Sequence, residues 1–94
     1  MPTRKQSTRT SPERFDPGPF PLEASVIVGN NVERLRIDEG LTKTKLCAMA
    51  GITRPTLNKI ESGAGDPRLS MMVKVAKALG VEVEDLLDAR WWEH

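Results

Sequence analysis

The chain has 94 residues, of which 38% are hydrophobic and 29% are charged, and its formal net charge is +1. This length predicts one small domain with a thin core. No apolar run is long enough to span a membrane, and the N-terminal residues lack the apolar segment of a secretory signal, so we expect a cytoplasmic protein without membrane contact.

Residues 1–24 are expected to form an extended, largely mobile arm. They contain five of the seven prolines and show little helical or strand periodicity. Two interpretations remain open for this basic segment. It is either a disordered tail or an arm that follows the DNA backbone or a minor groove, as homeodomain arms do.

A folded domain is expected over residues 25–89. Its first helix is predicted to run from Ala24 or Ser25 to Glu39, because Val28, Val32 and Leu35 recur on one helical face. Gly40 follows at the position of a C-cap glycine.

The central stretch, residues 41–63, reads LTKTKLCAMAGITRPTLNKIESG. Thr42 is expected to cap a helix over Lys43–Ala50, which Gly51 ends. Thr53 is expected to cap a second helix, from Arg54 to about Ser62. Two short helices joined by a tight turn predict a helix-turn-helix, whose second helix can enter the major groove of DNA.

The side chains of this stretch divide into an apolar and a cationic set. The positions expected to face the core are Leu46, Cys47, Ala50, Ile52, Leu57 and Ile60. Residues 42–60 contain no Asp or Glu, and their four cations are Lys43, Lys45, Arg54 and Lys59. A one-sided positive charge of this kind indicates a polyanionic partner.

Two further helices and a short tail complete the chain. The fourth helix is predicted to start between Arg68 and Ser70 and to end at Leu79. Its expected core positions are Leu69, Met72, Val75, Ala76 and Leu79. The fifth is expected from Val83 to Ala89. In the tail, residues 90–94, Trp91 and Trp92 are interpreted as a dimer or partner contact, with a loose end as the alternative.

Residues 29–87 resemble the phage-repressor helix-turn-helix domain (Cro/C1-type, or Xre-type). The resemblance is carried by Arg36, Gly40-Leu41-Thr42, Gly51-Ile52-Thr53, Ile60-Glu61, Gly63, Pro67 and Ala78-Leu79-Gly80-Val81. It implies an all-α, five-helix lambda-repressor-like DNA-binding domain, here with an extended N-terminal arm. Members are commonly homodimers that repress transcription.

The resemblance also implies roles for individual residues. Base contacts fall on Arg54, Pro55, Thr56, Asn58 and Lys59, and phosphate contacts are assigned to Thr42, Lys43, Lys45 and Thr53. Arg36 and Glu61 are expected to form a structural ion pair. Lys43 stands where the family often has Gln, and Pro55 can offer a base only apolar contact.

The predicted function is sequence-specific binding of double-stranded DNA by a homodimeric regulator, a repressor, on a palindromic site. The alternative is an antitoxin that binds a partner toxin and controls its own promoter, suggested by the Pro-rich arm and the Trp91-Trp92 tail. No small-molecule effector domain is expected, because little sequence follows the fifth helix.

Catalysis and metal binding are not expected. Cys47 is the single cysteine and His94 the single histidine, which leaves too few ligands for a zinc site and excludes an intramolecular disulfide. No nucleophile–base set can be recognised, and the loop GAGDP at residues 63–67 lacks the Lys and Ser/Thr of a phosphate-binding loop. We therefore expect neither an enzyme nor a cofactor.

Overall fold

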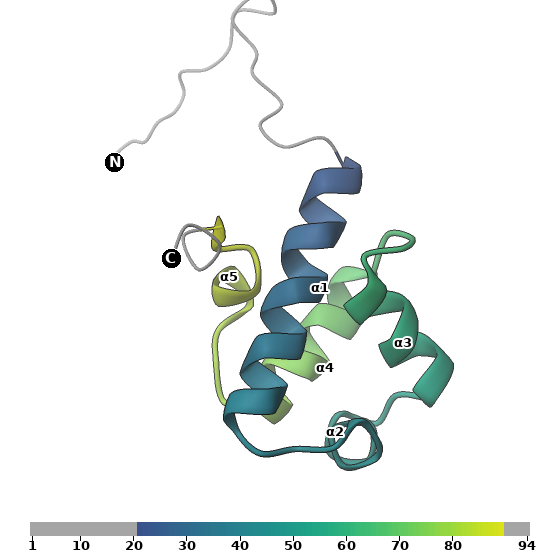
Figure 1. Ribbon diagram of the computed structural model, residues 1–94, viewed down its shortest axis with the longest axis vertical. Coiled ribbons are helices and arrows are strands. Elements are labelled where there is room, and N and C mark those ends of the chain that lie inside the picture. Colours follow the sequence, from purple (N-terminus) through teal and green to yellow (C-terminus); the bar gives the residue numbers. More distant parts are fainter. Residues whose placement is uncertain (1–20, 90–94) are drawn as a thin grey trace, which may run out of the picture.

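The computed structural model describes residues 21–89, which form five helices and no strand (Figure 1). The helices are α1 (Pro21–Asp38), α2 (Lys43–Ala50), α3 (Arg54–Ser62), α4 (Leu69–Leu79) and α5 (Val83–Leu86). The expected all-α, five-helix domain is confirmed over this range. Most of the expected arm, residues 1–20, and the tail with Trp91 and Trp92 lie outside the described residues.

Two helix ends differ from the sequence-based expectation. Helix α1 begins at Pro21 and therefore includes residues 21–24, which were expected to belong to the arm. Proline is well suited to the first turn of a helix, where its missing N–H costs no hydrogen bond. Helix α5 ends at Leu86, three residues before the expected end at Ala89, and Nδ2 of Asn31 on α1 donates to the carbonyl oxygens of Leu86 and Asp88 at this end.

The core lies around α1, the longest helix. In Figure 1 the α2–α4 part of the chain lies on one side of α1, and α5 lies on the other. The buried apolar residues of the core are Val28, Val32, Leu46, Cys47, Ala50, Leu57, Ile60, Met72, Val75, Ala76, Leu79 and Leu86. The core prediction was wrong for Leu69, which is 68% exposed. Leu69 is the first residue of α4, and the buried residues of this helix begin only at Met72.

Gly29 allows α1 and α3 to approach closely. A Cβ atom at this position would overlap the carbonyl oxygen of Ile60 and lie 2.9 Å from that of Glu61. Both obstacles are backbone atoms, which cannot rotate away as a side chain can. The absence of a side chain at Gly29 therefore sets how deeply the end of α3 is seated on α1.

Asn31 ties the C-terminal end of the domain to α1. Its Nδ2 donates to the carbonyl oxygens of Leu86 (2.9 Å), Asp88 (3.0 Å) and Asp85 (3.4 Å). The side chain is almost fully buried. The carbonyls of Leu86 and Asp88 lie at or beyond the end of the four-residue helix α5, and Asn31 provides a donor for both. None of the described helices combines the length and the apolar character needed to cross a membrane.

Candidate nucleic-acid interface

Local backbone chemistry shapes the turn between α2 and α3. Thr42 Oγ1 accepts a hydrogen bond from Lys45 N (3.0 Å), and Thr53 Oγ1 accepts one from Thr56 N (3.3 Å). Gly51 ends α2 with φ 71° and ψ 39°, a left-handed conformation that suits glycine. Its N–H donates to Cys47 O at 2.8 Å. The chain is thus redirected within three residues, and α3 is set at a fixed angle to α2.

Leu57 and Ile60 bury one side of α3 and leave the opposite side exposed. The exposed residues of α3 include Arg54, Pro55, Asn58 and Lys59, whereas Thr56 is half-buried. The charged members of this outward face are cationic, and Lys45 of α2 is exposed as well. A surface of this charge is attracted to the phosphates of nucleic acids.

Glu61 is the one acidic residue on α3, and it does not contribute to the outward face. Its side chain is only 4% exposed. Arg36 Nε of α1 donates to Glu61 Oε2 at 2.7 Å, and Arg36 Nη2 donates to Oε1 at 3.3 Å. The hydrogen bond to Glu61 raises the pKa of Arg36 above its ordinary value and outweighs the opposing effect of burial. The same guanidinium donates to Leu41 O at 2.9 Å, so it joins α1, α3 and the segment before α2.

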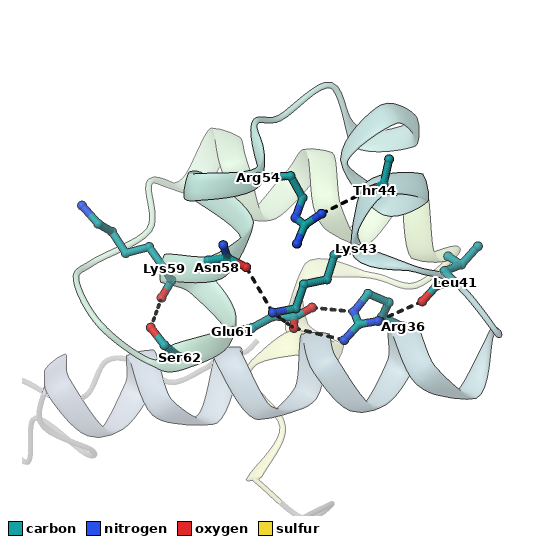
Figure 2. A network of polar contacts seen from close by, with 9 residues as sticks. All are labelled: Arg36, Leu41, Lys43, Thr44, Arg54, Asn58, Lys59, Glu61 and Ser62. Carbon is teal, nitrogen blue, oxygen red and sulfur yellow. Dashed lines mark hydrogen bonds and ion pairs between the residues drawn. The ribbon is translucent and has the colours of Figure 1, made fainter.

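Three polar contacts link α2 directly to α3 (Figure 2). Lys43 Nζ donates to Asn58 Oδ1 at 3.1 Å and lies 3.9 Å from Glu61 Oε1. Arg54 Nη1 donates to Thr44 Oγ1 at 3.0 Å. In Figure 2 the ammonium group of Lys59 points away from this network. The network therefore engages Lys43, Asn58 and Arg54, whereas Lys59 extends away from it.

A family model described as helix-turn-helix matches residues 32–86, more than half of the chain. The chain belongs to the helix-turn-helix family. This family is one of DNA-binding transcriptional regulators, and the Cro/C1-type resemblance seen in the sequence is confirmed.

The helix-turn-helix chain also resembles individual proteins. It is 34% identical over 66 residues to a protein of Sinorhizobium fredii named as an uncharacterized HTH-type transcriptional regulator, covering 70% of this chain and 86% of that one. The restriction-modification controller protein C.AhdI from Aeromonas hydrophila is 29% identical with a TM-score of 0.63, over 66% of this chain and 94% of its own. SinR of Bacillus subtilis, solved in complex with DNA, is 29% identical with a TM-score of 0.62, over 65% of this chain and 98% of its own.

The structure of this helix-turn-helix protein places most of the expected site residues together. Arg54, Pro55, Thr56, Asn58 and Lys59 lie on α3, while Thr42, Lys43 and Lys45 lie at the start of α2, and Thr53 precedes α3. Arg36 of α1 and Glu61 of α3 are paired between these two helices. Trp91 and Trp92 lie outside the described residues.

Sequence reasoning missed Arg68 as a candidate. A hollow of about 270 Å³ lies between α3 and the loop that leads to α4, and Thr56, Lys59, Asp66, Arg68 and Met71 are among the residues that line it. Arg68 is exposed and thereby adds a cation beside the outward face of α3. The signal was available, because Arg68 is a basic residue directly after the loop sequence GAGDP.

Among residues 21–89, no group of three or more His, Cys, Asp or Glu side chains is arranged to hold a metal ion.

Proposed function

We propose that this chain is a small transcriptional repressor that binds double-stranded DNA in a sequence-specific manner, with α3 in the major groove. The observation that carries the proposal is the charge on α3. Arg54 and Lys59 are exposed, whereas Glu61 is buried and paired with Arg36. The helix thus offers DNA its cations and its one amide, Asn58, while its carboxylate is neutralised by Arg36, which suits contacts to both base edges and phosphates.

The proposed contacts follow from position. Arg54, Pro55, Thr56, Asn58 and Lys59 are the candidates for base contact. Arginine and lysine suit guanine O6 and N7, and asparagine suits several edges depending on how its amide is turned. Thr42, Lys43, Lys45 and Thr53 surround the N-terminal ends of α2 and α3, where side chains and helix N-termini favour phosphate. Arg68 is proposed as an additional phosphate contact.

We further propose that the protein acts as a homodimer on a palindromic site. A single α3 of nine residues reads only a few base pairs. Two copies whose recognition helices are about 34 Å apart would read two half-sites separated by one helical turn. Trp91 and Trp92 remain the proposed dimer contact. Light scattering of the full chain and of a version lacking residues 90–94 tests this role, and an unchanged dimer after truncation would refute it.

The antitoxin alternative depends on the Pro-rich arm and on the Trp91-Trp92 tail. Residues 1–20 and both tryptophans lie outside the described residues. No described contact favours a toxin partner over DNA, so the repressor is the single function proposed.

Fluorescence anisotropy on labelled genomic fragments, repeated over a range of salt concentrations, tests the proposal. Tight binding to one fragment, with an affinity that falls steeply as salt rises, is the expected result. Equal and weak affinity for every fragment would contradict sequence-specific regulation. A double variant, Arg54→Gln with Lys59→Gln, removes the two cations of α3. It should keep the fold but no longer prefer that fragment.

A further inference from the structure

The contact between Lys43 and Asn58 fixes which way an asparagine amide faces. A lysine ammonium group has three N–H donors and no acceptor. An amide has a donor end, Nδ2, and an acceptor end, Oδ1, and only the acceptor end can face an ammonium. Lys43 Nζ lies 3.1 Å from Asn58 Oδ1, in agreement with this requirement. Figure 2 shows Oδ1 turned toward Lys43 and Nδ2 turned away from it.

Lys43 is itself held in place from the opposite side. Its Nζ lies 3.9 Å from Glu61 Oε1, and Glu61 is oriented by two hydrogen bonds from Arg36. The Lys43 side chain as a whole is 36% exposed. The orientation of Asn58 thus depends on a series of contacts that starts at Arg36 on α1 and passes through Glu61 and Lys43.

An asparagine turned in this way offers a distinct hydrogen-bonding pattern to the major groove. Adenine presents the N7 acceptor and the N6 amino donor, so an asparagine pairs with it through both ends of the amide. Guanine presents two acceptors, N7 and O6, which pair with donors alone. The positive charge of the Lys43 ammonium also opposes the approach of the partly positive hydrogen atoms of the adenine amino group to the same Oδ1 atom.

We propose that Lys43 is a positioning residue for base selection: it holds Asn58 Oδ1, so that Asn58 meets DNA through its N–H donors and prefers guanine to adenine. This inference rests on the proposed function, since it requires that α3 lies against base edges. It differs from a phosphate contact by Lys43, which would strengthen binding to every sequence equally.

The experiment first locates the base pair that Asn58 reads. Selection from random duplexes with the full chain, as wild type and as Asn58→Ala, identifies the position at which the alanine variant no longer shows a preference. Competition titrations then compare guanine with adenine at that position for wild type, Lys43→Met, Lys43→Arg and Lys74→Met. Lys74 is an exposed lysine on α4, so its variant controls for the loss of one positive charge. Thermal melts establish that each variant is folded.

The wild type is expected to favour guanine by about tenfold, the size of one good base contact. Lys43→Met should reduce this ratio to about twofold or less, because the amide is then free to turn. Lys43→Arg should restore it, since arginine also has donors and no acceptor. Lys74→Met should keep the wild-type ratio.

Three results would overturn the inference. One is a wild-type preference for adenine at the Asn58 position. Another is a Lys43→Met variant that binds both duplexes more weakly with an unchanged ratio, which would make Lys43 a phosphate contact alone. The third is the selection of no sequence by the wild type, which alone would also refute the proposed function. The first two leave that function standing, so the two failures can be told apart.

Discussion

Arg36 of α1 and Glu61 of α3 form a buried ion pair through two hydrogen bonds, 2.7 Å and 3.3 Å long. The pair joins the longest helix to the helix that faces outward, and it withdraws the one carboxylate of α3 from that face. Its main effect is thus on the position and charge of α3. Because buried pairs cost desolvation, we do not expect it to be a large net source of stability.

Removing one partner of this pair should nevertheless destabilise the domain strongly. Glu61→Ala leaves the Arg36 guanidinium, whose side chain is 11% exposed, without its counter-charge. The free energy of unfolding should fall by about 3–5 kcal/mol, as it does when one member of a buried pair is removed. Urea denaturation followed by circular dichroism measures this change.

The exposed pair between Arg34 and Asp38 provides the control for that measurement. These residues are one helical turn apart on α1, with 3.3 Å between Arg34 Nη1 and Asp38 Oδ2. Asp38→Ala should change stability by about 0.5 kcal/mol or less. Equal effects of the two substitutions would contradict the structural role of Glu61.

The pKa of Arg36 gives the sign of the pH dependence of its own contribution. The hydrogen bond to Glu61 raises that pKa in the folded state, so the contribution is fully present below the unfolded-state pKa. It is lost only as pH rises through the folded-state value, which is strongly alkaline. We therefore expect the contribution of Arg36 to the free energy of unfolding, which Glu61→Ala removes, to be the same at all pH values around neutrality. Urea titrations at several near-neutral pH values would show this.

Gly29→Ala should push α1 and α3 apart. The added Cβ meets the backbone carbonyls of Ile60 and Glu61, so one helix must move. We expect a loss of about 3 kcal/mol, at the upper end for overpacking, together with weaker DNA binding because α3 is displaced. Calorimetric melts and anisotropy report the two effects.

Gly51→Ala separates steric overlap from backbone strain. Gly51 has a positive φ, unlike the helical Gly29, and a Cβ atom at Gly51 would meet nothing within 4 Å. This variant should lose only about 1–2 kcal/mol, the cost of a left-handed non-glycine residue. A Gly29→Ala protein as stable as Gly51→Ala would show that α1 and α3 are not in close contact.

Asn31→Ala should loosen the C-terminal part of the domain. It removes the donor to the carbonyls of Leu86 and Asp88 and leaves polar atoms at a buried site unsatisfied. We expect a loss of about 1–3 kcal/mol, with faster amide exchange in α5 than elsewhere. Asn30→Ala, at the exposed neighbouring position, should be neutral or slightly stabilising because alanine favours helix. Uniformly faster exchange throughout the domain would argue against a local tie at α5.

Lys45→Gln tests the proposed phosphate contact on α2. The side chain is exposed at the start of this helix, so removing its charge should weaken binding to specific and random DNA to a similar degree. The slope of log affinity against log salt should become shallower by about 0.9, the change expected when one phosphate is no longer neutralised by the protein. Lys74→Gln on α4 is the matched control and should leave the slope unchanged. A Lys45→Gln protein with an unaltered slope would remove Lys45 from the interface.

Local chemistry explains why α2 and α3 could be placed from the sequence. Their starts depend on Thr42 and Thr53, and their ends on glycines with left-handed backbone, all within one turn of each helix. The apolar positions Leu46, Leu57 and Ile60 followed from periodicity in the same way and are buried. Periodicity failed at Leu69, because it identifies a face but not how far along that face a neighbouring helix extends.

Contacts between distant segments could not be derived from the sequence. Gly29 looks like any helical glycine until α3 is placed against it, and Asn31 meets a chain segment more than 50 residues further on. The resemblance implied the Arg36–Glu61 pair but not the contact from Lys43 to Asn58, which depends on the angle between α2 and α3. The cationic residues were evident from the sequence, whereas the contacts that orient Lys43 and Arg54 depend on how α2 and α3 are arranged in space.

The central claim is that paired α3 helices read DNA bases. The most direct test is a selection from random duplexes, carried out with the wild type and with Arg54→Gln. The wild type should enrich an inverted repeat whose half-sites are about one helical turn apart. Arg54→Gln should alter the base preference at the same position in both half-sites. Enrichment of no sequence, or an identical repeat from both proteins, would contradict the claim.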